Sequence, residues 1–273
     1  MKKIAIFFAI ACLYYSCQKT LNNPTPITAD CQLTRMVQGL HNDTVYLLSY
    51  DASGRLSSVK DSSYSFTATA VYDADGKITS IVTDAIMDTF RIKYKSNGLI
   101  ASITVVNYFG RDEYFYEFNS NNLPVLRTDI ATFHSSNGIV YDSSYRKYQY
   151  NAAGDIVRTL DYYDAKDTSY GTVTEYTYLD APNVFKQLNF FGVADYDIGF
   201  YNLLNMDFYF NKKMIRSYTS YAASDPTKQD QTIENYVQDS LNRFVGVISK
   251  TDDNTGLGDP SAINTRSFFY NCK

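Results

Sequence analysis

Hydrophobic and polar residues alternate along most of this chain. In Arg91–Tyr94, Ser102–Val105 and Tyr114–Phe118, one face collects Ile, Val, Tyr and Phe, while the other collects charged and hydroxyl residues. A period of two is the pattern of β-strands that bury one face. The pattern continues in Tyr145–Tyr150 and Glu175–Tyr178. We therefore expect an all-β fold.

A turn unit separates two of these strands. The stretch Tyr50-Asp51-Ala52-Ser53-Gly54-Arg55-Leu56 lies between two extended segments. Asp51 and Ser53 can bond to nearby backbone N–H groups, and Gly54 can adopt the positive φ that a short hairpin loop needs. This turn chemistry predicts an antiparallel strand pair.

The unit recurs with a fixed spacing. The second copy begins at Tyr72, and the third at Tyr94, so the spacings are 72 − 50 = 22 and 94 − 72 = 22. A fixed period in this range indicates a repeat architecture. The turn residues of the clearest copies are Tyr50, Asp51, Gly54, Tyr72, Asp73, Gly76, Tyr94, Gly98, Tyr150 and Gly154. Weaker copies are Phe118–Asn122, Tyr178–Val184, Phe210–Lys213 and Asp239–Phe244.

Each unit accommodates two strands of about seven residues and two turns, so eight units predict about sixteen strands. We expect an extended, twisted antiparallel β-meander of hairpin repeats, which the sequence leaves open, curled or sandwiched. Phe185–Met206 delays the next copy by 210 − 178 = 32 residues and suggests a short helix near 196–206. Thr251–Pro260 reads as a polar loop.

These units resemble the tyrosine-aspartate (YD, or RHS-type) repeats, whose pattern is roughly Y-D-x-x-G-R-L. The unit at Tyr50 fits the pattern fully, and the unit at Tyr72 fits with Lys77 in place of arginine. Over about residues 40–250, the chain is similar to the repeat-bearing lipoproteins of Bacteroidota. The resemblance implies a hairpin-repeat fold. It brings no activity with it.

The N-terminus has the organisation of a secretory signal. Lys2-Lys3 precede an apolar run, Ile4–Leu13, that is too short to span a bilayer. Ser16 followed by Cys17 resembles the bacterial lipoprotein signal, in which the cysteine is acylated. We expect a signal peptide at 1–16, a lipidated flexible tether at 17–30 and a β domain at 31–273. The alternative is a plain signal peptide and a secreted product.

The tether and the net charge bear on location and partners. Gln18-Lys19-Thr20 lacks the acidic surface-export signal of such lipoproteins, which favours an outer-membrane protein that faces the periplasm over one on the cell surface. Without Lys2 and Lys3 the charge is 23 − 29 = −6. An acidic domain argues against nucleic acid or an anionic membrane surface as partner.

Two cysteines lie at the ends of the expected domain. In an oxidising compartment, Cys31 and Cys272 are candidates for a disulfide that closes 272 − 31 = 241 residues. The chain-entropy model gives such a crosslink up to about 5 kcal/mol of stability. The competing reading is two free buried thiols.

The sequence offers little catalytic chemistry. Its two histidines, His41 and His134, fall in predicted loops, and no G-x-S-x-G, H-E-x-x-H or phosphate-binding glycine loop is present. Asp252–Gly256 lacks the register of a calcium loop. We therefore predict no catalytic, metal or cofactor site. The many tyrosines are expected to pack their rings on the sheet and keep their hydroxyls in water.

These features favour a non-catalytic binding or interaction surface, with a glycan or an envelope protein as partner. The alternatives are a glycan-binding module of a nutrient-uptake system, a glycoside hydrolase with two converging carboxylates, and a transmembrane β-barrel, which charges on many strands oppose. The triplets Asp43-Thr44-Val45 and Asp239-Ser240-Leu241 resemble the O-glycosylation acceptor of Bacteroidota. That resemblance implies glycan on Thr44 and Ser240.

Overall fold

The structure is a computed structural model that describes residues 31–39, 44–62, 66–84, 89–106, 110–135, 138–169, 171–185, 209–240, 243–253 and 263–272. These residues form sixteen strands. They are β1 (Cys31–Gln38), β2 (Thr44–Tyr50), β3 (Leu56–Asp61), β4 (Phe66–Tyr72), β5 (Ile78–Thr83), β6 (Thr89–Tyr94), β7 (Ile100–Val106), β8 (Gly110–Phe118), β9 (Pro124–Ser135), β10 (Gly138–Tyr150), β11 (Ile156–Tyr162), β12 (Thr172–Pro182), β13 (Lys213–Ala222), β14 (Asp225–Gln238), β15 (Phe244–Asp253) and β16 (Ile263–Cys272).

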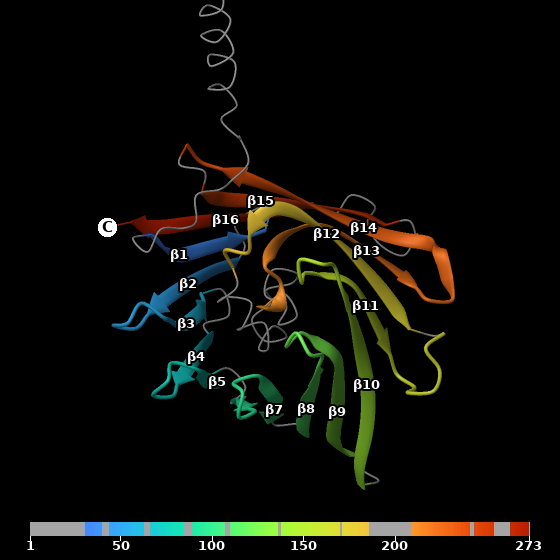
Figure 1. Ribbon diagram of the computed structural model, residues 1–273. Helices are drawn as coiled ribbons and strands as arrows, with labels where there is room; N and C mark the ends of the chain where they lie inside the picture. Colours follow the sequence, from blue (N-terminus) through green and yellow to red (C-terminus); the bar gives the residue numbers. More distant parts are fainter. Residues whose placement is uncertain are drawn as a thin grey trace, which may run out of the picture.

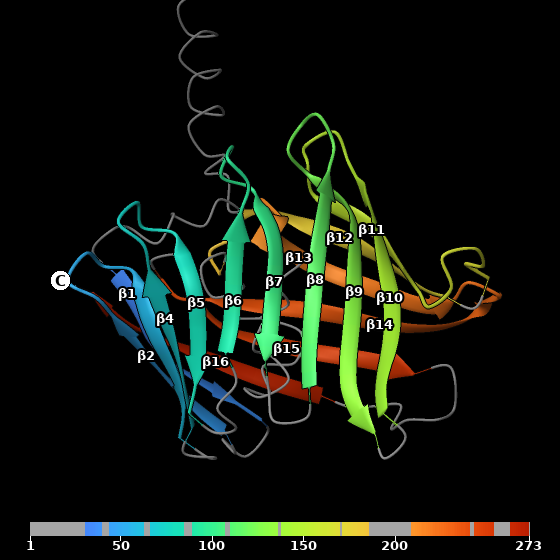
Figure 2. The ribbon, with the colours of Figure 1, turned by 90° about the horizontal axis from the view of Figure 1, so that it is seen from below.

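The strands form one closed antiparallel barrel. Each strand pairs with its neighbours in the sequence, and β16 pairs with β1 to close the sheet (Figures 1 and 2). The expected antiparallel meander of about sixteen strands is confirmed. Of the open, curled and sandwiched forms that the sequence allowed, the sheet takes the curled one and closes into a barrel. The helix predicted at 196–206 and the predicted signal and tether segments lie outside the described residues.

The apolar core fills one side of the barrel interior. Cross-strand pairs such as Leu48 with Val59 and Ile92 with Ile103 are buried, and they belong to a cluster that draws on both β1–β8 and β15–β16. Residues from strands this far apart around the sheet meet only inside it. The ring of Phe185, which follows β12, packs 4.7 Å from that of Phe268 in β16.

Six tight turns among the described residues share a hydrogen bond from the N–H of their first residue to the carbonyl of their fifth, and in the first five of them the N–H of the fourth residue also donates to the first carbonyl. In the first, the Asp51 N–H donates to the Arg55 carbonyl and the Gly54 N–H donates to the Asp51 carbonyl, both at 2.9 Å. The Asp51 carboxylate accepts the N–H groups of Ser53 and Arg55. Gly54 has φ +77°, and Asn122 takes the same left-handed position in the fourth turn with φ +61°. The six turns are Asp51–Arg55, Asp73–Lys77, Lys95–Leu99, Asn119–Leu123, Asn151–Asp155 and Asp239–Arg243.

All six turns connect an even-numbered strand to the next odd-numbered one, so they lie at the same end of the barrel. We call this end the turn end and the opposite end the loop end. The chain enters β1 and leaves β16 at the turn end as well, because Cys31 pairs with Cys272. The sequence repeat therefore marks one rim of the barrel.

Some sequence assignments were wrong in detail. The copies at Tyr178 and Phe210 are not hairpin turns, because Tyr178 lies within β12 and Phe210 precedes β13 after a long connection. The stretch Phe185–Met206, which we call the insertion, stands in the sequence where these two copies would have formed one turn. His134 lies in β9 rather than in a loop, and Thr251 belongs to β15.

A ladder of tyrosine hydroxyls joins successive units. Tyr72 donates to the Leu56 carbonyl at 2.7 Å and Tyr94 donates to the Ile78 carbonyl at 2.8 Å, each at the start of the preceding odd-numbered strand. The expectation that the tyrosine hydroxyls stay in water was wrong for these residues, because each part-buried hydroxyl donates to a backbone carbonyl. The ladder consists of Tyr50, Tyr72, Tyr94, Tyr150, Tyr178 and Tyr270.

The fifth turn holds the far end of the insertion. Asp155 is fully buried, and its Oδ1 accepts the N–H groups of Lys212 at 2.7 Å and Lys213 at 3.0 Å. A second hydrogen bond joins the same two segments, because Asn211 Oδ1 accepts the Ile156 N–H at 3.0 Å. The aspartate stands where Arg55 stands in the first unit. Because an aspartate replaces the arginine of the repeat at this position, the start of β13 is held against the β10–β11 turn.

Asp155→Ala is expected to lower the free energy of unfolding by about 2–4 kcal/mol, because two part-buried backbone N–H groups lose their acceptor. Asp155→Asn is the matched control, since its Oδ1 still accepts both bonds, and we expect less than half of that loss. Urea denaturation of the two variants measures the difference. Equal stability of Asp155→Ala and the parent protein would contradict the assignment.

Candidate binding site in the polar wall of the barrel interior

The interior changes character between β8 and β11. Tyr116 of β8 faces inward, because it is buried in the core with its ring 5.9 Å from that of Phe210. Arg127 of β9 lies directly opposite Tyr116, Arg146 of β10 lies opposite Arg127, and Asp161 of β11 lies opposite Arg146. Directly opposed residues share one face of a sheet. These charged side chains therefore face the barrel interior.

We call this surface the polar wall. It consists of the inward-facing residues Asp112, Tyr114, Arg127, Asp129, Ser144, Arg146 and Asp161.

Two arginine–aspartate pairs dominate the polar wall. Arg127 donates from Nε and Nη2 to the two carboxylate oxygens of Asp129, each at 2.7 Å. Arg146 donates to Asp161 in the same way, with Nη2 2.8 Å from Oδ2. Ser144 adds a longer bond of 3.4 Å to Asp129. Bidentate pairing fixes the planes of the guanidinium groups, and it allows two like charges to stand on opposed positions.

Solvent reaches the polar wall. The side chains of Arg127 and Asp129 are 15% and 18% exposed, and those of Arg146 and Asp161 are 19% and 32% exposed. In contrast, inward-facing Ile103 is fully buried. The interior is thus packed with apolar side chains on one side and open to solvent along β9–β11. Partial solvation also spares these charges the full cost of burial.

The polar wall offers both neutral and charged groups for hydrogen bonding. Burial raises the pKa of Asp112, and the charge of Asp129 adds to this effect. Burial also raises the pKa of Tyr114 to about 12, so its phenol remains a donor at neutral pH. The Arg127 guanidinium carbon lies 5.5 Å from the centre of the Tyr114 ring. The polar wall therefore combines N–H and O–H donors, carboxylate acceptors and an aromatic ring.

The carboxylates of the polar wall are poorly arranged for acid–base catalysis. A glycosidase needs one carboxyl to protonate the leaving group and a second one to act as nucleophile or base. Both oxygens of Asp129 and both oxygens of Asp161 accept bonds from arginine. These hydrogen bonds direct both carboxylates at the neighbouring guanidinium groups, which leaves neither of them aimed at a ligand as an acid, base or nucleophile. The polar wall is better suited to holding a ligand than to transforming one.

A second inward-facing charged cluster, on β14–β16, is structural. Ser249 donates to Glu234 at 2.6 Å, and Arg266 donates to Ser249 at 3.2 Å. All three side chains are buried. Because solvent does not reach them, they stabilise the closing strands and offer no ligand surface.

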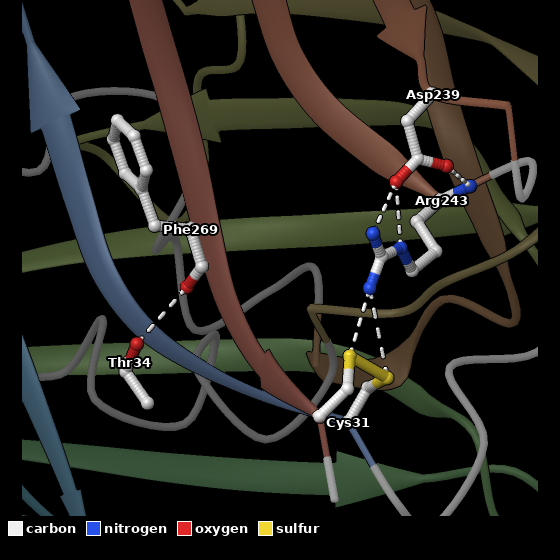
Figure 3. The surroundings of a disulfide bond; sticks show 6 residues. Cys31, Thr34, Asp239, Arg243 and Phe269 are labelled. Atoms are coloured by element: carbon white, nitrogen blue, oxygen red, sulfur yellow. Dashed lines mark hydrogen bonds and ion pairs between the residues drawn. A yellow bond between two sulfur atoms is a disulfide. The ribbon is translucent and has the colours of Figure 1, made fainter.

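The predicted disulfide between Cys31 and Cys272 is formed, with an S–S distance of 2.03 Å. Arg243 of the last turn donates to the Cys272 sulfur at 2.8 Å and bonds to Asp239, so the sixth turn covers the crosslink (Figure 3). The turn residues singled out in the sequence lie at the turn end and build the fold. Cys17 lies outside the described residues.

The sequence did not single out the polar wall. A signal was available, because Arg127-x-Asp129 places opposite charges on the same strand face, but the sequence does not show that this face points into a barrel. Of the two glycosylation candidates, Thr44 begins β2 and Ser240 is exposed in the sixth turn. Among the described residues, no group of three His, Cys, Asp or Glu side chains is placed to hold a metal ion. No helix in the described ranges is long and apolar enough to cross a membrane.

No protein-family model and no curated protein matches the sequence. Two solved structures have a similar fold, and both are described as porin-like proteins, one from Bacteroides uniformis and one from Bacteroides vulgatus. The first gives a TM-score of 0.58 at 12% identity, and the second gives 0.56 at 15% identity. The matches cover 91% and 88% of this chain and 98% of each of the others. At these identities, the likeness shows a common barrel fold.

Proposed function

We propose that this chain is a non-catalytic binding protein of the bacterial outer membrane, attached through a lipid on Cys17, and that its ligand contacts the polar wall. The observation that carries the proposal is the pair of bidentate arginine–aspartate contacts that face the interior and remain open to solvent. The porin-like names of the structural neighbours support an outer-membrane location. The recurring turn geometry supports kinship with YD-repeat lipoproteins.

The outer face favours attachment over spanning. Exposed charges lie on outward positions of several strands, including Lys93 in β6, Lys147 in β10 and Glu175 in β12. A lysine facing lipid at the bilayer centre costs about 2–4 kcal/mol. We therefore place the barrel beside the membrane, facing the periplasm. The tether at 17–30 would reach β1 at the turn end, so the loop end points away from the bilayer.

A glycan is the ligand class that the polar wall fits best. Each bidentate pair presents donors and acceptors side by side, which matches adjacent sugar hydroxyls, and the Tyr114 ring adds a surface on which a sugar ring can pack. The acidic net charge disfavours a polyanion. A glycan ligand also agrees with a role beside a nutrient-uptake system.

Arg146→Ala is expected to weaken glycan binding at least tenfold, because it removes the donors of one pair and leaves Asp161 without them. The experiment is a thermal-shift screen of residues 18–273, which hold every described strand, against envelope and plant glycans, followed by calorimetry on each hit. A ligand at a hundred times its dissociation constant should add about 2.7 kcal/mol to the free energy of unfolding. The outward-facing variant Arg91→Ala is the control and should bind normally.

Two results would refute this proposal. A hit whose affinity is unchanged by Arg146→Ala would place the ligand elsewhere. Release of shortened sugars on long incubation with the parent protein, abolished by Asp112→Asn, would replace the binding role with glycoside hydrolysis.

A further inference from the structure

In the β9–β10 hairpin, β10 extends beyond β11, the strand with which it pairs on the side away from β9. β10 pairs with β9 from Gly138 onward, but its pairing with β11 begins only at Tyr145. Residues Gly138–Ser144 of β10, which we call the β10 edge, thus have a paired strand on one side alone among the described residues. Figure 1 shows this part of β10 reaching beyond β11 at the loop end of the barrel.

Large apolar side chains gather at this tip. Ile139 and Tyr141 are 54% and 71% exposed, and Val140 and Phe133 are also exposed. Successive residues point to opposite faces, so the tip is apolar on both of them. Clusters of this kind on an open strand are a recognised site for pairing with another chain.

The backbone of the β10 edge is oriented to accept a strand. The Ser143 N–H donates to the Asp142 carboxylate at 2.8 Å, so it points away from β9. In an antiparallel pair, alternate residues direct both backbone groups to the same side. Ile139 and Tyr141 therefore also direct their N–H and C=O groups away from β9. These groups form the start of an unused hydrogen-bond ladder.

We propose that the β10 edge binds an extended segment of a partner protein by strand addition. The open backbone groups of Ile139 and Tyr141 select an extended chain, and the exposed side chains select apolar residues on it. Asp142 supplies the single charge of the edge, so it selects a lysine or arginine on the facing strand. The predicted partner segment is short, apolar and basic.

A second copy of this chain fits less well. Two β10 edges would pair antiparallel, and antiparallel pairing would turn the two turn ends in opposite directions. Both copies would then need anchors in different membranes. The loop end, where the β10 edge lies, is free to meet a different protein when the turn end is tethered. The open backbone groups belong to Ile139 and Tyr141, which are not part of the polar wall, so the inference stands if no glycan binds, whereas the exclusion of a second copy rests on the proposed anchor.

The test measures binding of a capped eight-residue peptide of alternating valine and threonine with one central lysine. Titration calorimetry on the purified protein should show binding, and amide exchange at Ile139 and Tyr141 should slow. Methylating the peptide nitrogens on one edge should weaken binding at least tenfold, whereas methylating the other edge should leave it unchanged. The proposal would be overturned if methylation of either edge weakened binding equally, or if the unmodified peptide did not bind at 1 mM.

Protein variants give an independent readout. Tyr141→Pro removes an N–H that faces away from β9, so it should abolish peptide binding while the β9–β10 pairs remain. Tyr141→Phe is the matched control and should bind normally. If Tyr141→Pro lowers the melting temperature markedly, the methylated peptides still decide the question. A dimer that dissociates when Asp142→Lys is introduced, with no peptide binding, would assign the edge to a second copy and refute the partner.

Discussion

Removing the Cys31–Cys272 disulfide is expected to lower the free energy of unfolding by about 3–5 kcal/mol, one of the two largest effects that we predict. The crosslink joins residues 241 positions apart, so it removes a large share of the conformational freedom of the unfolded chain. It also sits on the seam where β1 meets β16. Without it, closure of the barrel depends on that strand pairing and on the apolar cluster that spans the seam.

Denaturant titration of the oxidised protein and of the double variant Cys31→Ser/Cys272→Ser measures this effect. Arg243→Gln is the matched control, because it removes the side chain that covers the sulfurs and leaves the covalent bond. We expect that control to cost about 1 kcal/mol. A double variant within 1 kcal/mol of the parent, with unchanged amide exchange in β1 and β16, would show that the seam holds without the crosslink.

The hairpin units were predictable because the information is local. Each tight turn is specified by five residues, of which the first is Asp or Asn in five of the six turns, and a glycine or Asn122 takes the left-handed position in the first five turns. The spacing of 22 residues then sets strand length and number. The disulfide was predictable for a different reason, since only two cysteines flank the strands.

Closure and the polar wall were not predictable from the same patterns. Alternation says that a strand has one buried face, but it does not say that the first and last strands meet. Each tight turn also carries a register shift, as between Ser49 and Tyr50 or between Gln149 and Tyr150. A shift of this kind reverses which residues face inward, so inward and outward positions cannot be counted across it. Which face Arg127 and Asp129 occupy could not be read from the sequence for this reason.

The tyrosine ladder has members on both sides of the seam between β1 and β16. Tyr270 of β16 bonds to the Phe244 carbonyl at 2.7 Å, and Tyr50 of β2 bonds to the Leu33 carbonyl at 2.8 Å, so the ladder continues on both sides of the seam. Burial raises the pKa of Tyr50 to about 12, and it also raises the pKa values of Tyr94, Tyr178 and Tyr270. The ladder is therefore a stabilising element that depends on phenol protons.

Raising the pH from 9 to 12 is expected to unfold the protein. The pKa values of the ladder phenols of Tyr50, Tyr72, Tyr94, Tyr178 and Tyr270 are higher in the folded protein than the unfolded value of 10. Their stabilisation is therefore complete below pH 10 and is lost as the pH rises through the folded pKa. For Tyr50 alone, a rise from 10 to about 12 corresponds to about 2 kcal/mol after allowance for partial exposure. Several such groups together are comparable with the whole free energy of unfolding of an ordinary domain.

Urea denaturation at a series of pH values, with the disulfide kept oxidised, checks this prediction. Tyr50→Phe should cost about 1 kcal/mol at pH 7, because it removes one hydrogen bond, and it should make the alkaline decline shallower by about one proton. Tyr163→Phe, at a position 74% exposed, is the control and should change neither quantity. A flat profile to pH 12 would contradict the ladder. Equal slopes for the parent and Tyr50→Phe would show that other groups cause the decline.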